Sequence, residues 1–590
     1  MQHPPTTNHE SSRQNRARLI LQLNKNNGAK PVIKRHPDTP APLSYAQERL
    51  WIMSQLEPGN PIYNMAGAIR LDGVLNIKAL QQSLDEVVRR HDILRSRFVG
   101  EFHQAVQCVM PDSRLPLLRL DLTGSASISV EDCADAFNRA PFDLSSAAPL
   151  RGMLAALENG QYLLVLVLHH IVADRWSVGV LMKEVAALYA AFSNGLPSAL
   201  PEPPIQYGDY ALWQRQQAER SEKHLDYWLQ KLHNAPPLLA IPTDYPRPPL
   251  QSYRGNGYEF EMTQPLSAAI NVLGKQYNAT LFIVMAAAFT SLLYRYTGSK
   301  DLAIGYPVAG RNQAQLADLI GFFVNTLVLR CRLSDDLSFA GLLAGIREQS
   351  LQDQAHQEFS FGQLVETLNP VRHADHTPLF QVMLAVQNVP TTIFRMPGLS
   401  ATPEQLNHHV AQFDLTLFIE ERDGRLHGLF EYNTDLFDAA TLARMAGHLQ
   451  TLLAGAACDP NLPVAQLPLL GAEEHRQLLY DWNKPSATTE QNTPLALVHE
   501  LFEAQAKTVP EKAALVFAGQ SLSYGELDKQ ASRLADELKA RGMGPESRVG
   551  VSAERSLELI VGLLAVLKAG AAYVPLDPAY PDERLDYMLH

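Results

Sequence analysis

The run of six apolar residues at positions 163–168 restricts the possible folds of this chain more than any other segment. It reads Leu-Leu-Val-Leu-Val-Leu, with no alternation between apolar and polar residues. A bilayer-spanning helix needs roughly 20 apolar residues, whereas a short continuous run is typical of a strand buried on both faces. Because such a strand needs cover on both sides of its sheet, the run predicts an α/β fold.

Two dense segments, Leu43 to about Asn234 and Tyr258 to about Ala457, both alternate helical patterns with short apolar runs. The stretch between them holds six prolines and is typical of a linker. The helices that we expect are Ile77–His91, Trp176–Ser193, Ser221–Leu232, Leu266–Tyr277 and Leu281–Tyr296. The expected strands are Met65–Leu71, Tyr162–Leu168, Tyr258–Met262 and Leu302–Tyr306.

These patterns predict two α/β lobes followed by a third, incomplete unit. We expect a tail, a short helix (Arg13–Asn24) and a connector at 1–42, a first lobe at 43–233, a crossing linker at 234–256, a second lobe at 257–457, a linker at 458–496, and the start of another α/β domain at 497–590. The last segment has helical patterns at Ser523–Gly542 and Ser556–Ala569, a strand pattern at Ser547–Ala553, and ends within a predicted element.

The composition argues against several classes of protein. Hydrophobic residues make up 46% and charged residues 19%, which indicates a folded protein. The formal charge of −12, without a long basic run, argues against nucleic-acid binding. No apolar run is long enough for a membrane span or a signal peptide. Four scattered cysteines without a CxxC pair argue against a disulfide framework and fit a reducing cytoplasm.

The best candidates for chemistry stand where the buried strand ends, at His169, His170 and Asp174. Adjacent residues on extended backbone point to opposite faces, so only one histidine can face a cleft. A histidine there can act as a general base, because its ordinary pKa lies near 6.5. The alternative is a pair of structural histidines beside a helix-capping Asp174. A metal site is less favoured, since no third ligand stands nearby in sequence.

The hexapeptide 169–174 resembles the HHxxxD signature of nonribosomal peptide synthetase condensation domains. Further motifs of that family occur in order, in the segments 43–51, 90–98, 207–213, 320–326 and 356–361. Residues 522–527 and 567–577 are similar to the first two motifs of an adenylation domain. The catalytic segments of that domain would lie beyond His590, so we expect no adenylation activity from this chain.

The resemblance implies two chloramphenicol-acetyltransferase-like lobes that form a V with a central tunnel. It implies an acyltransferase-type amide synthase of secondary metabolism, which joins a donor acyl or peptidyl thioester to the amine of an acceptor aminoacyl thioester. The substrates would travel on 4'-phosphopantetheine arms of upstream and downstream carrier domains. No cofactor would be bound covalently, and we expect a cytoplasmic monomer that binds neither nucleic acid nor membrane.

The resemblance assigns a role to each site residue. His170 would be catalytic, and His169 and Asp174 would support it. Asp174 would pair with an arginine, for which Arg295 is the first choice and Arg90 the second. Residues of the tunnel would be Arg175, Trp176, Ser177 and Asn325. For Asn325 the alternative is a strand-edge residue that bonds backbone.

Arg175 departs from the family pattern, which usually has glycine after the aspartate. Glycine leaves room where a long arm passes, whereas arginine is bulky and always charged. The arginine therefore raises the possibilities of a narrower tunnel and of a noncatalytic module that recruits carrier domains or tailoring enzymes. The N-terminal position adds a third reading, a starter domain that acylates the first amino acid of a lipopeptide from fatty acyl-coenzyme A.

Overall fold

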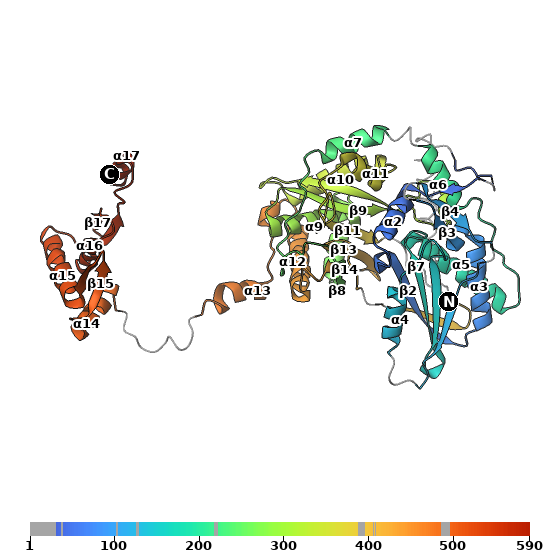
Figure 1. The fold of residues 1–590 in the computed structure, drawn as a ribbon, viewed down its shortest axis with the longest axis horizontal. Helices are drawn as coiled ribbons and strands as arrows, with labels where there is room; N and C mark the ends of the chain where they lie inside the picture. The colour runs from blue at the N-terminus through green and yellow to red at the C-terminus, as the bar shows by residue number, and fades with distance from the viewer. Residues whose placement is uncertain are drawn as a thin grey trace, which may run out of the picture. The chain divides into compact units, whose positions relative to one another are not determined.

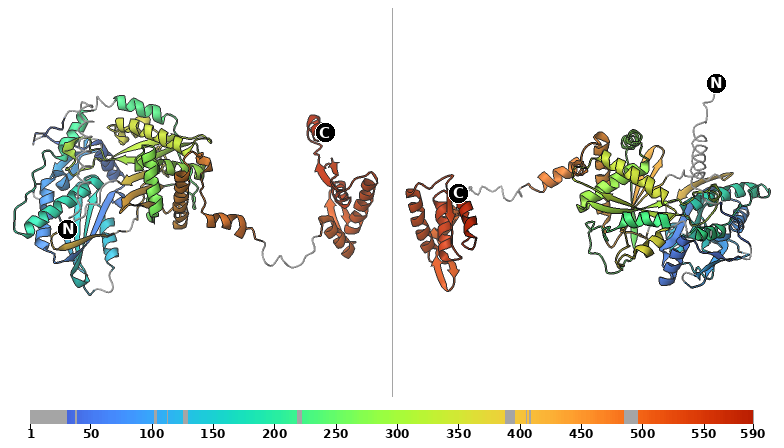
Figure 2. Two further views of the ribbon diagram at one scale, coloured as in Figure 1. Left: turned by 180° about the vertical axis from the view of Figure 1, so that it is seen from behind. Right: turned by 90° about the horizontal axis from the view of Figure 1, so that it is seen from above.

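The computed structural model describes residues 31–36, 39–101, 104–111, 113–124, 129–217, 222–387, 396–404, 406, 409–484 and 496–589. The helix predicted at Arg13–Asn24 lies outside these residues. The chain divides into two compact units, Met1–His475 and Arg476–His590. The first unit contains both lobes (Figures 1 and 2).

The first lobe is built on a five-stranded sheet whose central strand is the apolar run. Its order is β12 (Leu399–Glu404), β2 (Asn64–Gly73), β7 (Gln161–His169), β6 (Leu150–Ala156) and β5 (Leu117–Asp121). Strand β7 pairs antiparallel with β2 and with β6, so its backbone is satisfied on both edges. This arrangement explains why the run carries no polar residue.

Both faces of β7 are covered, as the sequence predicts. Leu164, Leu166 and Leu168 lie in a core cluster with residues of α3 (Ile77–Arg90) and α5 (Arg175–Ser193). The alternate residues, among them Val165 and Val167, pack in a second cluster with Ala134 of α4 (Val130–Arg139). The period of two along a strand therefore divides one apolar run between two cores.

The first lobe also contains a second, smaller sheet, two further helices and several 3-10 turns. That sheet has the order β1 (Ala41–Pro42), β4 (Val106–Val109) and β3 (Ser96–Val99). The helices are α2 (Tyr45–Leu56) and α6 (Tyr207–Gln216), and the short 3-10 turns are η1 (Pro61–Tyr63), η2 (Asp92–Arg95) and η4 (Glu158–Gly160). A capping box at Ser44, in which the Ser44 hydroxyl accepts from the Gln47 N–H, fixes the start of α2.

The second lobe has a six-stranded sheet with a layer of helices on one face (Figure 1). The strand order is β10 (Asn325–Arg332), β9 (Asp301–Val308), β11 (Val382–Gln387), β13 (Leu415–Arg422), β14 (Arg425–Asn433) and β8 (Gly255–Glu261). The helices of this lobe are α7 (Glu222–Leu232), α8 (Gln264–Gln276), α9 (Leu281–Thr297), α10 (Phe339–Ala355), α11 (Phe361–Leu368) and α12 (Ala439–Cys458), with 3-10 turns η6 (Ala314–Leu316) and η7 (Val464–Gln466).

Helix α9 lies at the centre of this lobe and is apolar on every side. Its residues from Ile283 to Tyr294 are all buried. Trp228 and Leu232 of α7 belong to the same core, although the sequence pattern places that helix in the first segment. The passage from one lobe's core to the other therefore precedes α7.

Two parts of the second segment return to the first lobe. Strand β12 pairs antiparallel with β2, with Ala401 opposite Leu71. Residues Leu316, Leu319, Ile320 and Phe323 lie in the core cluster of the first lobe. The two lobes are therefore held together by exchanged chain as well as by side-chain contacts.

The second unit contains four short strands packed with helices. Its elements are η8 (Gln477–Asp481), α14 (Val498–Thr508), β15 (Ala513–Phe517), β16 (Gln520–Ser523), α15 (Tyr524–Ala540), β17 (Arg548–Val551), α16 (Leu557–Lys568), β18 (Ala572–Pro575) and α17 (Asp582–Leu589), preceded by α13 (Ala472–Arg476) at the junction of the units. Ala535, Ala565 and Ala569 form a small core between α15 and α16. The Lys568 ammonium donates to Glu503 and Asp528 at 2.6 and 2.7 Å.

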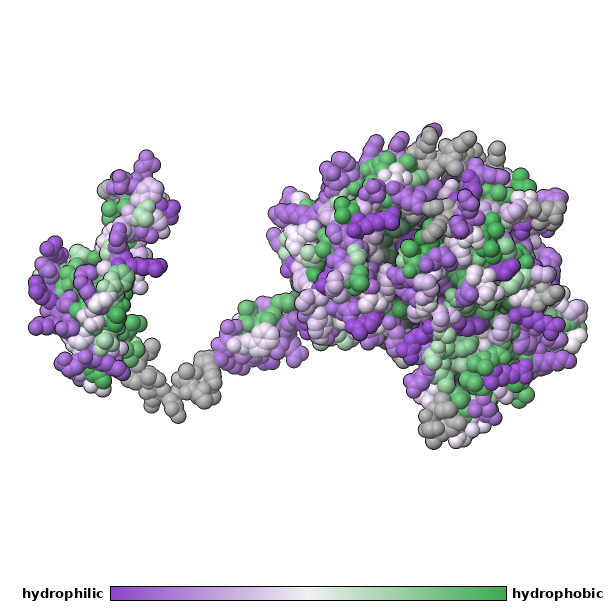
Figure 3. All heavy atoms as spheres, viewed as in Figure 1, coloured by the Kyte–Doolittle hydropathy of each residue, from purple (hydrophilic) through white to green (hydrophobic). Residues whose placement is uncertain are grey.

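No single described helix is long and apolar enough to cross a bilayer. Helices α8 and α9 reach that length and composition only together, and they are bent by 107° at their junction. On the face drawn in Figure 3, hydrophilic and hydrophobic residues are interspersed over the first unit.

Candidate active site

The histidine pair stands in a tight connection between β7 and α5. Strand β7 ends at His169, and α5 begins at Arg175 with Asp174 as its N-cap. The His170 N–H donates to the carbonyl of Tyr63 at 2.8 Å, and the Val172 N–H donates to the carbonyl of His169 at 3.0 Å. These two backbone hydrogen bonds restrict the conformation of the loop that carries the two imidazoles.

His169 points into the first lobe. Its side chain is buried beside the rings of Tyr63 and Phe142, and its Nδ1 accepts from the Ile171 N–H at 3.1 Å. Burial, aided by the neighbouring His170, lowers the pKa of His169 to about 3. This imidazole is therefore neutral near pH 7.

His170 points the other way and is only half-buried. Its Nδ1 lies 2.8 Å from the carbonyl oxygen of Ala173, and its ring centroid lies 4.7 Å from that of Phe322. Because a carbonyl oxygen only accepts, Nδ1 carries the proton and Nε2 is the basic nitrogen. Burial lowers the pKa of His170, against an opposing effect of Asp174. The two side chains therefore point to different sides of the loop, as the sequence predicts.

Asp174 is completely buried and holds the loop to the second segment of the chain. Its carboxylate accepts from the Ser177 N–H at 2.8 Å and from the Phe323 N–H at 3.0 Å. The Arg311 Nη2 donates to the same carboxylate at 3.2 Å, and both side chains of this ion pair are almost wholly buried. Asp174 thus joins the start of α5 to the segment after β9.

The predicted partners of Asp174, Arg295 and Arg90, were wrong. Arg295 is in the last turn of α9 and donates to the carbonyl of Leu467 at 2.6 Å. Arg90 ends α3 and makes a bidentate ion pair with Glu184, both bonds being 3.0 Å. Each guanidinium is thus occupied by a partner within its own lobe.

Arg311 was missed, although its place in the sequence carried a signal. It follows β9, which was predicted from the sequence as a strand, and strand ends are where α/β folds present functional groups. The guanidinium lies 4.1 Å from the ring centroid of Phe323, and it also donates to the carbonyls of Leu316 and Leu319. These contacts pin the segment 311–323 under the histidine loop.

The other predicted tunnel residues connect the same two segments. The Trp176 indole N–H donates to the carbonyl of Ala317 at 2.8 Å. The Ser177 hydroxyl lies 2.7 Å from the carbonyl oxygen of Gly321 and accepts from the Gly321 N–H at 3.1 Å. A side chain at Gly321 would collide with the ring of Tyr207 at 1.9 Å, so only glycine fits there.

Asn325 lies at the start of β10 and bonds backbone groups. Its Nδ2 donates to the carbonyls of Gln357 and Phe359 at 2.9 and 2.7 Å, and its Oδ1 accepts from the Phe361 N–H at 3.0 Å. The amide group is thus occupied by the loop before α11. The Asn325 amide therefore bonds backbone at the strand edge, and the residue also lines a cavity.

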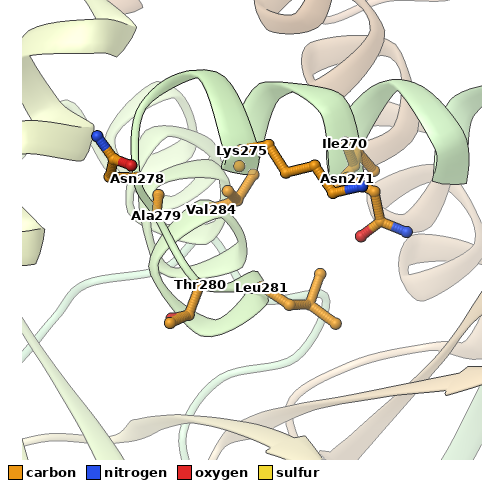
Figure 4. A pocket seen from close by; sticks show the side chains of 9 residues that line it. Ile270, Asn271, Lys275, Asn278, Ala279, Thr280, Leu281 and Val284 are labelled. Carbon is orange, nitrogen blue, oxygen red and sulfur yellow. The ribbon is translucent and has the colours of Figure 1, made fainter. Parts of the chain in front are cut away.

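A cavity opens beside these residues, between elements of both lobes. Tyr45, Trp213 and Gln214 line it from the first lobe, and Phe322 and Asn325 line it from the second segment. The wall residue Phe322 is the residue whose ring contacts His170. A second hollow, at the corner between α8 and α9, contains none of the predicted site residues (Figure 4).

Arg175 reaches from the histidine loop to the sheet of the second lobe. Its Nη2 lies 3.6 Å from the Oε2 of Glu420 on β13, and the Arg422 Nη2 donates to the same oxygen at 2.8 Å. The side chain of Arg175 stays 60% exposed, so its guanidinium remains accessible to solvent. Glu420 is a residue of this site that the sequence did not single out.

Among the described residues, one group of three potential metal ligands comes together, and it includes neither His169 nor His170. It consists of His373, Asp375 and His376, whose ligand atoms lie within 4.8 Å of one another. The two imidazole rings are stacked at 4.6 Å with only 19° between their planes. Lone pairs in nearly parallel planes do not converge on one ion, so this arrangement is a ring contact rather than a preformed metal site.

The chain matches two family models and is similar to known proteins. A model of the condensation domain matches residues 38–479, and a model of the AMP-binding enzyme matches residues 502–590. The chain is 41% identical over 557 residues to chondramide synthase cmdD of Chondromyces crocatus, covering 93% of this chain and 14% of that protein. It is 37% identical over 577 residues to phosphinothricin tripeptide synthetase PhsC of Streptomyces viridochromogenes, covering 95% of this chain and 52% of that protein.

Solved structures match the fold as well. A four-domain nonribosomal peptide synthetase bound to AMP and glycine has a TM-score of 0.76 and 25% identity, over 96% of this chain and 44% of that one. The first condensation domain of the calcium-dependent antibiotic synthetase, in complex with a substrate analogue, has a TM-score of 0.63 and 20% identity, over 74% of this chain and all of that one. The chain thus spans only part of the curated relatives and of the four-domain structure that it matches.

Proposed function

Because this chain belongs to the condensation-domain family of nonribosomal peptide synthetases and continues into the start of an AMP-binding domain, we propose that it joins a donor acyl or peptidyl thioester to an amine. The amine is that of an acceptor aminoacyl thioester, and both substrates arrive on the phosphopantetheine arms of carrier domains. The observation that carries this proposal is His170, whose Nδ1 is held by the carbonyl of Ala173 so that its Nε2 is the basic nitrogen.

The chemistry follows from that tautomer. The Nε2 lone pair accepts a hydrogen bond from the attacking amine, which orients the nitrogen toward the thioester carbonyl. When the C–N bond forms and the C–S bond breaks, Nε2 takes the proton from the amine nitrogen and returns it to the leaving thiolate. The lowered pKa of His170 keeps the imidazole neutral, and therefore able to accept, near pH 7.

Asp174 has a different role from the aspartate of a serine protease. In that enzyme class the carboxylate bonds the Nδ1–H of the histidine. Here a backbone carbonyl takes that place, and Asp174 bonds Arg311 and the backbone of residues 177 and 323. We therefore assign Asp174 to positioning: it holds the loop that carries His170 against the second segment.

The test is amide formation between loaded carrier domains, followed by intact mass spectrometry of the acceptor carrier. The His170→Ala variant should lose at least about 100-fold in rate, because a positioned general base contributes about 10²–10⁴-fold. The exposed His373 is the matched control, and His373→Ala should keep the wild-type rate. An unchanged rate in His170→Ala would favour the noncatalytic recruitment module instead.

The same assay separates a starter domain from a chain-elongating one. We propose the elongating reaction, in which the donor is an upstream carrier thioester. Each reaction is offered either fatty acyl-coenzyme A or an acylated upstream carrier domain as the donor. Product from acyl-coenzyme A alone would assign the chain to the starter class.

A further inference from the structure

The sheet of the second lobe has one face in the helical core and one face toward the first lobe. On β13, Leu415, Leu417 and Ile419 lie in the core, so the alternate residues Thr416, Phe418 and Glu420 point the other way. Glu420 is within 3.6 Å of Arg175 from the histidine loop. In Figure 1 the strands β13 and β14 lie between the helices of their own lobe and the strands of the first lobe. We call the face with Glu420 the inner face.

Glu431 of β14 is on this inner face. It stands directly opposite Thr416 of β13 and opposite Gly257 of β8. Its neighbours in sequence, Phe430 and Tyr432, point into the helical core and are buried.

The carboxylate of Glu431 is half-buried and has no cation beside it among the residues that the structure describes. It bonds the backbone of Gln412, in the loop before β13, and no described Lys, Arg or His comes within ion-pair distance. The described arginines on or against this face have other partners: Arg175 and Arg422 lie against Glu420, and Arg425 of β14 pairs with Glu261 of β8. Burial raises the pKa of Glu431 to about 7, with only the Gln412 bond opposing it.

The other charged or titratable groups that alternation places on the inner face are carboxylates, arginines that are already paired, and one histidine. Glu259 of β8 and Glu420 of β13 are on the same face as Glu431, as is His427 further along β14. In the loop before β13, His409 is paired with Asp135 of the first lobe at 2.9 Å. Among the described residues on or against this face, the carboxylates Glu259, Glu261, Glu420 and Glu431 outnumber the arginines Arg175, Arg422 and Arg425.

We propose that Glu431 binds the ammonium group of the amine substrate. This proposal rests on the proposed function and adds a recognition group to it. A half-buried carboxylate that lacks a charged partner gains most from a ligand that brings the opposite charge next to it. The amine substrate of the reaction is the component that carries an ammonium group, either its α-ammonium or a side-chain ammonium.

If the group is the α-ammonium, Glu431 also accepts the proton that the ammonium must lose before it can attack. An ammonium has no lone pair and cannot attack, so it first transfers one proton to the carboxylate. The neutral amine then forms the C–N bond while the C–S bond breaks, and its second proton passes through His170 Nε2 to the thiolate. If the group is a side-chain ammonium, Glu431 acts as an anchor that selects basic acceptors.

The test uses Glu431→Gln with alanyl and lysyl carrier thioesters as amine substrates. The carboxamide keeps an acceptor oxygen for the Gln412 backbone but has no charge, so a purely structural role would leave the rate unchanged. We expect kcat/KM for the amine to fall by about 10- to 100-fold, the range of a lost charged contact of 1.5–3 kcal/mol. A fall with both amines assigns the α-ammonium, and a fall with the lysyl substrate alone assigns the side chain. No fall with either amine overturns the proposal.

The matched control is Glu261→Gln, at the exposed end of β8 where Glu261 pairs with Arg425, and it should keep the wild-type kcat/KM. The wild-type to Glu431→Gln rate ratio should also rise with pH through about 7, as the carboxyl group ionises. A ratio independent of pH contradicts the proposal. Both proteins act on the same substrate, so the ionisation of the substrate does not change this ratio.

A second measurement needs no variant. In the wild-type protein, butylammonium should inhibit competitively against the amine substrate, and 1-butanol of similar shape should inhibit at least 10-fold more weakly. Equal inhibition would overturn the proposal even if Glu431→Gln failed to fold. The His170→Ala result separates the two hypotheses: loss of activity there, with full activity in Glu431→Gln, leaves the amide-forming function in place and removes only the ammonium site.

Discussion

The ion pair between Asp174 and Arg311 should dominate the stability of the histidine loop. The carboxylate is fully buried, and the Arg311 side chain is 4% exposed. Replacing Asp174 by Ala leaves this guanidinium buried without its counter-charge, which costs about 3–5 kcal/mol when one partner of a buried pair is removed. The change also removes the N-cap of α5, and a lost cap alone costs about 0.5–2 kcal/mol.

These two costs do not simply add, because the same oxygen, Oδ1, accepts from the Ser177 N–H and from Arg311. We therefore expect Asp174→Ala to lower the free energy of unfolding by about 4–5 kcal/mol. Domains are typically stable by about 5–15 kcal/mol, so the variant should fold but with a much lower urea midpoint. Urea titration followed by tryptophan fluorescence suits the measurement, since Trp176 lies two residues from the changed position.

The double-mutant cycle gives the decisive comparison. Asp174→Ala and Arg311→Ala remove the same contact. The double variant should therefore lose about 1.5–3 kcal/mol less free energy of unfolding than the two single losses added together. Arg295 lies on α9 and bonds Leu467, so Asp174→Ala and Arg295→Ala should be additive within about 0.5 kcal/mol. Additivity with Arg311 together with coupling to Arg295 would refute the pairing described above.

Three further predictions concern neighbouring residues. Arg175→Gly should change the free energy of unfolding by no more than about 1 kcal/mol in urea titration, because Arg175 is mostly exposed and Glu420 retains its ion pair with Arg422. A larger loss would show that the contact between the lobes depends on Arg175. The pKa of His169, about 3, lies below the value near 6.5 of an unfolded chain, so protonation favours unfolding and stability falls as pH drops below 6.5. Between pH 6.5 and 5 the free energy of unfolding of the wild type should fall by up to about 2 kcal/mol more than that of His169→Asn. The asparagine oxygen can still accept from the Ile171 N–H, so the variant keeps that bond. Equal pH dependence of the two proteins in thermal melts would contradict this prediction. Asn325→Leu strands two carbonyls and one N–H and should cost about 2–4 kcal/mol in urea titration, whereas a loss below about 1 kcal/mol would mean that water replaces the amide.

Local patterns in the sequence were sufficient for most of the helices and strands. The apolar run at 163–168 became the central strand β7, and the helix expected at Ile77–His91 is α3, Ile77–Arg90. The opposite orientations of His169 and His170 also followed from the strand geometry alone. These features depend on backbone periodicity over a few residues, which is written directly in the order of apolar and polar side chains.

The partners across the lobes were decided only by the tertiary structure. Asp174 and Arg311 are 137 positions apart, and β12 joins a sheet whose other strands all come from the first segment. Which guanidinium meets a buried carboxylate depends on the path of the chain between them, because several arginines have suitable chemistry and only one lies at the right place. The inner-face position of Glu431 has the same origin: alternation along β14 gives it a face, but only the packing of the two lobes directs that face toward the first lobe.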